Sequence, residues 1–575
     1  MKKDNKKNKN INKNLSNKKK ISINDKFSMI IDNCKLDKIK DLLNNKIFIR
    51  ILIVLISFSI SLLSLYLMIG KVTDILKYIT LIVSFIFSYV YLSKNYRDIF
   101  KLIRNNKIYS IISLIFSMII YYEMMGIPLI DEVKYRFFNI EWFYYFIFPS
   151  LCLIFTIFFI LIKDWFIKFF KKMDSFEKKA YLITSLITLV ILMFTYYSTD
   201  YFYMQFDRVY SIDSGLVYNG YFPDPHYYGI KHPLTSLINF PMYAIINFIF
   251  SSNLKAVILQ YINIQLLIFI GLELKRLTNS KWVYVLYMLS FSTMLYSLFF
   301  EKYVLIVFLL VTYLYNTYIE KKDGTNLLIL TVGMMPTNIF IGITEFFKGR
   351  KFNDMSKYLT KLFLTTLLIF VVAGRIHCFP NGMSELAFER GSGTPFFPMD
   401  KNINAATKMV THSFIAIASD KEFYNEGAFF LKFYRYMWND VEGNISYVGI
   451  GIILIILFGI VDIIKNKRKI YYSFLSGFIF SLLLFIVLTW DTKVSPLFSI
   501  CFSWAIIPLF IFGIERIFNL FKINKNYNKY IYGILIIIML FINIREIINI
   551  YEFANTYDDY RYDYRYEKYI DIHQK

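Results

Sequence analysis

Long apolar runs recur along this chain, and they constrain its fold more than any other feature of the sequence. A helix of about 20 apolar residues, rising 1.5 Å per residue, crosses the hydrocarbon core of a membrane. Hydrophobic residues make up 56% of the 575 residues, and the mean hydropathy is +0.45. This composition excludes a water-soluble multidomain protein, a disulfide scaffold and a collagen-like fibre. We therefore expect an all-α, polytopic membrane helical bundle.

The apolar runs predict thirteen transmembrane helices. Their expected positions are 47–69, 73–92, 107–125, 142–162, 180–198, 256–274, 281–299, 303–319, 358–374, 445–464, 470–490, 497–514 and 529–547. Two further apolar stretches carry helix-breaking residues. The stretch 234–250 contains Pro241 and follows Pro233, so we expect helices in the outer interface. The stretch 326–345 is interrupted by Gly333, Pro336 and Asn338, so we expect a re-entrant or broken hairpin.

The net charge of +23 is distributed like that of a membrane protein and does not indicate nucleic-acid binding. Nine lysines lie in residues 1–20, and much of the remaining excess lies in short loops between apolar runs. Lysine and arginine concentrate on the cytoplasmic side of membrane proteins, which predicts a multi-pass protein with a cytoplasmic N-terminus. The abundance of Ile, Lys, Asn, Phe and Tyr is typical of AT-rich genomes, so we expect a bacterial cytoplasmic membrane, with an AT-rich eukaryote as the alternative source. The four cysteines have no spacing typical of a disulfide pair or a zinc site.

The same patterns suggest six regions. They are a Lys/Asn-rich, disordered cytoplasmic tail (1–46), a four-helix membrane region (47–179), a core (180–375) with an external loop (199–233), an external region of loop and short helices (376–444), C-terminal membrane helices (445–547) and a Tyr-rich external tail (548–575).

The external loop 199–233 has the densest group of chemically active residues. It contains four aspartates and two of the five histidines, namely Asp200, Asp207, Asp213, Asp224, His226 and His232. A carboxylate at the membrane edge can deprotonate an alcohol, while a lipid-linked co-substrate reaches it laterally through the membrane. The simpler alternative is that these aspartates cap short interfacial helices, with Asp200 as an N-cap.

The segment from Phe206-Asp207 through Asn219-Gly220-Tyr221 to His232-Pro233-Leu234 and Pro241 resembles the C superfamily of glycosyltransferases (GT-C). Within this superfamily it is similar to bacterial relatives of the family-39 protein mannosyltransferases. The likeness continues to Glu301-Lys302-Tyr303 and covers roughly residues 180–375. The chain departs from the family pattern because four predicted spans precede the motif loop, where the family usually has one.

The resemblance implies an inverting transfer of a sugar from a polyprenyl-phosphate donor to an acceptor on the outer face, with a loop aspartate as general base. Asp207 is the matching position and our first choice, followed by Asp200 and Asp224. Asp213, His226 and Glu301 are further candidates for the site. Glycan, lipid or protein acceptors are all open, and membrane lipid is the expected surrounding.

A phosphate-linked donor requires cations at the outer interface, because the leaving phosphate gains negative charge as the glycosidic bond breaks. The candidates are Arg375, His377, Lys231 and His232, and Arg375 fits best by position. The alternative for Arg375 is a side chain that snorkels to the interface or a charge at a helix terminus. No spacing indicates a metal site, so no metal ligands are assigned, although a divalent metal cofactor stays possible.

Two other functions remain open at this point. One is a lipid-linked oligosaccharide flippase or other transporter, which would place ionisable residues at mid-bilayer depth. Only Glu273 comes close to that depth. The other is an oligosaccharide polymerase or ligase, which would depend on external arginine and histidine more than on aspartate.

Overall fold

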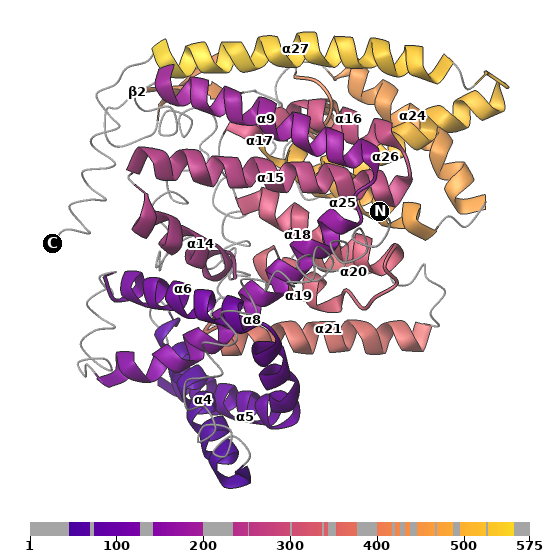
Figure 1. Cartoon of the computed structure of the whole chain (residues 1–575). Coiled ribbons are helices and arrows are strands. Elements are labelled where there is room, and N and C mark those ends of the chain that lie inside the picture. Colours follow the sequence, from indigo (N-terminus) through magenta and orange to yellow (C-terminus); the bar gives the residue numbers. More distant parts are fainter. Residues whose placement is uncertain are drawn as a thin grey trace, which may run out of the picture. The chain divides into compact units, whose positions relative to one another are not determined.

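The computed structural model describes most of the apolar helices and few of the loops (Figure 1). The described residues are 45–68, 74–126, 142–198, 234–250, 252–298, 302–335, 338–342, 352–375, 399–416, 420–425, 432–437, 445–465, 469–486, 495–524 and 527–556. They fall into two compact units, of which the first holds the helices up to residue 172 and the second holds the elements from residue 173 onward.

The first unit contains four long helices. They are α4 (Lys46–Tyr66), α5 (Asp74–Asn105), α6 (Lys107–Gly126) and α8 (Trp142–Lys171). Helix α4 packs against α5 and α8, and α6 packs against α8. Both α5 and α8 continue well beyond their predicted apolar spans, because lysine and arginine are good helix formers and carry the helix on past the apolar run.

The first unit packs through small polar residues and exposes large apolar ones. Ser57, Ser61 and Ser64 of α4 are buried, and their hydroxyls donate to carbonyl oxygens one turn earlier. By contrast, Ile82 and Ile86 of α5 are each 55% exposed. Small residues at helix contacts and isoleucine on the outer surface are typical of helices packed within lipid.

The second unit begins with α9 (Ser175–Ser198), α14 (Thr235–Ile249), α15 (Ser252–Thr278), α16 (Lys281–Leu289), α17 (Phe291–Leu298), α18 (Lys302–Tyr318), α19 (Thr325–Met334), α20 (Ile339–Gly342) and α21 (Phe352–Val372). It continues with α23 (Met399–His412), strands β1 (Asp420–Asn425) and β2 (Lys432–Met437), α24 (Tyr447–Lys465), α25 (Lys469–Ile486), α26 (Ser495–Leu520) and α27 (Asn528–Thr556). Its core is centred on α15, α18 and α26, and it buries Trp504 of α26, Tyr313 of α18, Tyr287 of α16 and Tyr296 of α17.

Eight described helices are long and apolar enough to cross a membrane, and four shorter apolar helices accompany them in the described residues. The eight are α4, α5, α6, α8, α15, α24, α26 and α27. The prediction of a helical, membrane-type architecture is therefore confirmed. The count of thirteen crossings and the cytoplasmic N-terminus stay predictions.

One predicted span is broken in the middle. The sequence predicts a single helix over 281–299, whereas the structure divides it at Ser290 into α16 and α17. Asn543 of α27 stabilises this break, because its amide donates to the carbonyl oxygens of Leu289 and Phe414, both at 2.8 Å. The Asn543 side-chain oxygen accepts the N–H of Ala416 at 2.9 Å. The break therefore depends on residues far away in the sequence.

The other interrupted stretch agrees with the sequence. Helix α19 ends at Met334, two residues before Pro336, and the short α20 follows from Ile339. The stretch 234–250 forms one 15-residue helix, α14, which contains Pro241.

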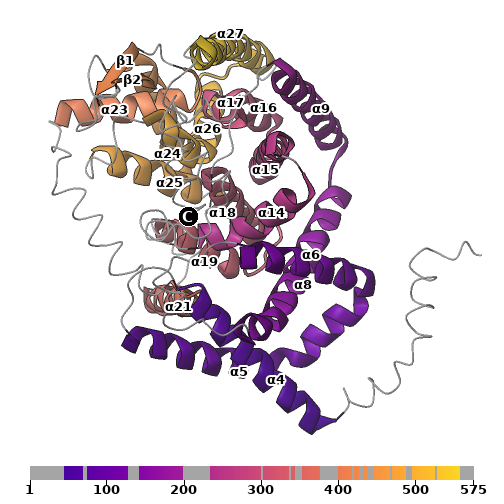
Figure 2. The same ribbon diagram turned by 90° about the vertical axis from the view of Figure 1, so that its left-hand side faces the viewer.

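The region 376–444 was expected to form a loop and short helices, and its described part holds one helix and one hairpin. Strand β1 pairs antiparallel with β2, with Asp420 opposite Met437. The two strands are rich in aromatic residues, which favour β-structure. These residues are Phe423, Tyr424, Phe433, Tyr434 and Tyr436. Figure 2, in which α15 and α27 are viewed nearly end-on, shows α23 lying across their direction. Ala405, Ala406, Met409 and Val410 of α23 are buried, so α23 belongs to the core of the second unit.

Candidate functional site

Most of the residues that the sequence singles out lie outside the described residues. These are Asp200, Asp207, Asp213, Asp224, His226, Lys231, His232, Glu301 and His377. Arg375 is described, as are residues on either side of the loop 199–233 and of Glu301. The candidate site is therefore built from Arg375 and these flanking residues.

The loop 199–233 ends beside the last turns of α19 and α21. The N–H of Leu234, the residue after Pro233, donates to the carbonyl oxygen of Gly333 at 3.1 Å. A Cβ placed on Gly333 would lie 2.2 Å from Leu234 Cδ1 and 3.4 Å from a ring carbon of Phe370. Leu234, Gly333 and Phe370 thus meet, which holds Leu234, the first described residue after the loop, against the ends of α19 and α21.

Arg375 follows Phe370 in a helix-ending turn. Gly374 has the left-handed φ of 67°. The N–H of Arg375 donates to the Phe370 carbonyl at 2.7 Å, and that of Gly374 donates to Val371 at 3.0 Å. These two hydrogen bonds define a Schellman motif, which glycine favours at this position. The motif sets the place where the chain leaves α21 and holds the Arg375 backbone against the last turn of that helix.

The Arg375 side chain is buried, with 2% of the residue exposed. An arginine that snorkels to a membrane interface keeps its guanidinium in water. The burial of Arg375 is therefore inconsistent with simple snorkelling, and of the two alternatives it leaves a charge at a helix terminus, since Arg375 directly follows the end of α21. A guanidinium with its planar set of donors can bind a phosphate through two parallel hydrogen bonds.

Polar side chains of α15 hold the chain just before Glu301. Gln260 donates to the carbonyl oxygen of Ser297 at 2.6 Å, and Asn263 donates to that of Tyr296 at 2.9 Å. On the other side of Glu301, Lys302 begins α18 and is only 2% exposed. The positions before and after Glu301 are thus both held in the packed part of the second unit.

Two further buried cations, missed by the sequence reasoning, come from α15 and α23. Lys255 donates to Asn247 at 3.1 Å and its ammonium lies 4.1 Å from the centre of the Tyr243 ring. Lys408 is 9% exposed, and the neighbouring His412, one turn later, is fully buried at 5.7 Å from the ring of Phe291. In the sequence, Lys408 and His412 could be noticed only by their i, i+4 spacing, and this spacing is common in any helix.

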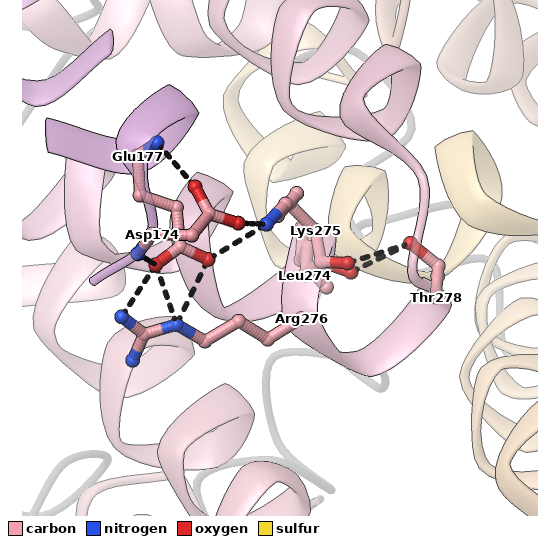
Figure 3. Close-up of polar contacts among 6 residues, drawn as sticks. All are labelled: Asp174, Glu177, Leu274, Lys275, Arg276 and Thr278. Atoms are coloured by element: carbon pink, nitrogen blue, oxygen red, sulfur yellow. Dashed lines mark hydrogen bonds and ion pairs between the residues drawn. The ribbon is translucent and has the colours of Figure 1, made fainter. Parts of the chain in front are cut away.

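A second polar cluster joins the start of α9 to the end of α15 (Figure 3). Glu177 accepts hydrogen bonds from Arg276 at 2.7 Å and from Lys275 at 3.0 Å, while Lys275 also contacts Asp174. Asp174 and Glu177 form a capping box, in which each carboxylate accepts the other's backbone N–H, at 2.8 and 3.2 Å. Burial alone would raise the pKa of Glu177, but hydrogen bonds from Arg276 and Lys275 outweigh it and lower that pKa.

This cluster is structural in character. Every carboxylate in it is matched by a cation or a helix N-terminus, so it fastens two helices that are about 100 residues apart in sequence. One turn earlier on α15, the fully buried Glu273 accepts a hydrogen bond from Thr312 at 2.8 Å. Glu273 therefore lies close to the Lys275 and Arg276 end of its helix and away from the middle of the span.

Within the part of the chain that the structure describes, no group of three or more histidine, cysteine, aspartate or glutamate side chains could hold a metal ion. Comparison of the chain with protein-family models, with curated proteins and with solved structures found no match.

Proposed function

We propose that this protein is a membrane glycosyltransferase of the GT-C type. It moves a sugar from a polyprenyl-phosphate-linked donor to an acceptor at the outer face of a bacterial cytoplasmic membrane. The proposal includes thirteen crossings with the N-terminus in the cytoplasm. The observation that carries it is the buried Arg375, which follows α21 in a Schellman motif, while Phe370 of that helix and Leu234, the first described residue after the aspartate-rich loop, both border Gly333.

Arg375 supplies the donor-binding half of the proposed reaction. The leaving polyprenyl phosphate gains charge as the bond to the sugar breaks, and a desolvated guanidinium stabilises that charge more strongly than an exposed one. In this mechanism Asp207 removes the proton from the acceptor hydroxyl, and the acceptor oxygen attacks the anomeric carbon from the face opposite the phosphate. The anomeric configuration is therefore inverted.

The test measures release of polyprenyl phosphate and formation of the glycosidic product by the purified protein in lipid nanodiscs. The donors are a panel of polyprenyl-phosphate hexoses, and the acceptors are a membrane extract and a peptide mixture. Asp207→Asn should reduce the rate by at least about a hundredfold, because loss of a general base costs about 10²–10⁴. Arg375→Gln should act similarly, whereas Arg375→Lys should retain part of the rate.

Matched controls come from exposed positions of α5. Asp98→Asn and Arg104→Gln make the same chemical changes at exposed sites and should leave the rate unchanged. Normal turnover by Asp207→Asn would remove Asp207 from the mechanism. Movement of a lipid-linked sugar across vesicles without any glycosidic product would replace the transferase by a transporter.

One observation bears on the polymerase or ligase alternative. Besides Arg375, the second unit buries His412 and Lys408 of α23, and a polymerase or ligase depends on arginine and histidine more than on aspartate. The two enzymes differ in the effect of Asp207→Asn, which should abolish the transferase and spare the polymerase. Their acceptors differ too, since a polymerase requires a glycan that is still attached to lipid.

A further inference from the structure

A lysine-lined cavity lies at the other end of the helices that lead to the candidate site. It has a volume of about 600 Å³ and is formed by the turn between α18 and α19 together with the first turns of α21. Its charged lining consists of Lys321, Lys322, Asp323, Asp354, Lys357 and Lys361. Four cations face two carboxylates, so the lining carries a net positive charge of two (4 − 2).

The charges of this cavity are only partly neutralised from within. Lys322 pairs with Glu320 at 3.0 Å, and the side chain of Asp323 accepts hydrogen bonds from the N–H and hydroxyl of Thr325 at 2.9 and 2.5 Å. Lys321, Lys357 and Lys361 form no ion pair with another described residue. Three ammonium groups are therefore available to a ligand that enters the cavity.

The cavity lies at a boundary between polar and apolar surface. On α21, Lys357 and Lys361 are exposed, and directly after them Phe363 and Leu364 are 43% and 55% exposed. On the other side, Ile319 is 45% exposed next to the turn that carries Lys321. Large exposed apolar side chains that follow exposed lysines are typical of the level at which lipid headgroups meet acyl chains.

We propose that this cavity binds the phosphate of an anionic phospholipid headgroup. The three lysines contact the phosphate oxygens, and the acyl chains lie along the apolar surface formed by Ile319, Phe363 and Leu364. The phosphate chemistry is shared with free inorganic phosphate, but the adjacent apolar surface favours the lipid. The inference does not depend on the transferase proposal, because the cavity lies away from Arg375, at the opposite end of α21.

The test uses the full-length protein purified in detergent and titrated with short-chain phosphatidylglycerol, short-chain phosphatidylcholine or sodium phosphate. Binding is read by native mass spectrometry and by thermophoresis. The protein should bind phosphatidylglycerol at least about tenfold more tightly than phosphatidylcholine, since each basic residue near a lipid surface contributes about 1 kcal/mol. The triple variant Lys321→Gln, Lys357→Gln and Lys361→Gln should lose this preference.

A control triple variant removes the same charge elsewhere. Lys94→Gln, Lys101→Gln and Lys168→Gln alter exposed lysines of α5 and α8 and should keep the preference. Equal losses in the two triple variants would overturn the proposal, because the effect would then come from net charge alone. Equal affinity for sodium phosphate and phosphatidylglycerol would overturn the lipid assignment in favour of a free anion.

A gain of binding gives an independent measurement that does not rely on removing lysines. The carboxylate of Asp354 lines the cavity and would repel a bound phosphate. Asp354→Asn should therefore tighten phosphatidylglycerol binding by about threefold to tenfold. Unchanged or weaker binding by this variant would contradict a headgroup in the cavity.

Discussion

The backbone N–H of Leu234 donates a 3.1 Å hydrogen bond to the carbonyl oxygen of Gly333, and the Leu234 side chain occupies the space where a Gly333 side chain would lie. This contact joins the end of the aspartate-rich loop to the interrupted stretch of the bundle. It is also the reason why a glycine is needed at position 333, although the φ of Gly333 is not left-handed.

Gly333→Ala should therefore destabilise the protein and disturb the candidate site. The new Cβ would lie 2.2 Å from Leu234 Cδ1 and 2.8 Å from its Cγ, and Cγ can move away only if the buried leucine changes its χ1 rotamer or the backbone shifts. Overpacking of this kind costs about 1–3 kcal/mol, more than the helix propensity gained from alanine. The control is Gly451→Ala in α24, where nothing lies within 4 Å and a small gain in stability is expected. Thermal unfolding in detergent distinguishes them, and equal melting temperatures would contradict the contact.

Asn543→Leu should be one of the most damaging single changes in the second unit. The variant leaves the Leu289 carbonyl and the Ala416 N–H buried without the partner that they have now. Each such loss costs about 1–3 kcal/mol. Asn549→Leu, on the same helix, removes only one hydrogen bond to Glu546 and should cost far less. If both variants unfold at the same temperature, the Ser290 break does not depend on Asn543.

Glu177→Gln should weaken the packing between α9 and α15. Glu177 is 2% exposed and faces Arg276 and Lys275, so its neutralisation removes the carboxylate that pairs with Arg276 and leaves Lys275 with Asp174 alone. Breaking a buried pair costs about 3–5 kcal/mol, whereas a surface pair contributes about 0–1 kcal/mol. Lys322→Gln breaks a pair whose lysine is 61% exposed and serves as the control. Chemical unfolding should show a large loss for Glu177→Gln and a small one for Lys322→Gln.

The same carboxylate should make stability depend on pH. The folded pKa of Glu177 is lowered, so its stabilising contribution is complete above the unfolded value of about 4.3 and is lost as pH falls through the folded value. Melting temperatures of the wild-type protein should therefore fall as pH is lowered below about 4.3. Glu177→Gln should show a shallower fall, and parallel curves for the two proteins would contradict this account.

Glu273→Gln should be tolerated, with stability equal to or above that of the wild-type protein. Glutamine keeps an oxygen that can accept the Thr312 hydrogen bond and removes a carboxylate that is fully buried. Thr312→Val is the converse change and should destabilise, because it removes the donor to that carboxylate. If Glu273→Gln abolished substrate transport in vesicles, a proton-coupled transporter would displace the transferase proposal.

Much of the helical framework could be predicted from residue type alone. The helices α4, α6 and α15 coincide with apolar runs, and the end of α19 coincides with Gly333 and Pro336. An apolar run of spanning length has few alternatives, and a proline ends a helix by a local mechanism. Features with local causes of this kind can be predicted from the sequence without knowledge of the tertiary structure.

Other features could not be predicted, because their causes lie far apart in sequence. Ser290 is an ordinary helix residue, and the chain breaks there because Asn543 and Phe414 bind the freed backbone groups. Similarly, nothing near Glu177 in the sequence identifies Arg276 as its partner. The hairpin of β1 and β2 was missed because a short run of aromatic residues suits a strand and an interfacial helix alike.

For the candidate site, the sequence alone determined which residue types are available: an aspartate-rich loop, the arginine at 375 and the glycine before it. Only the tertiary structure decided that Arg375 is buried and that the loop ends beside its helix. The apolar composition of the chain determines that its helices lie in lipid, because long apolar runs partition into a membrane wherever they occur in the sequence. Burial of a charge depends on which distant helices pack around it, and that information exists only in the folded chain.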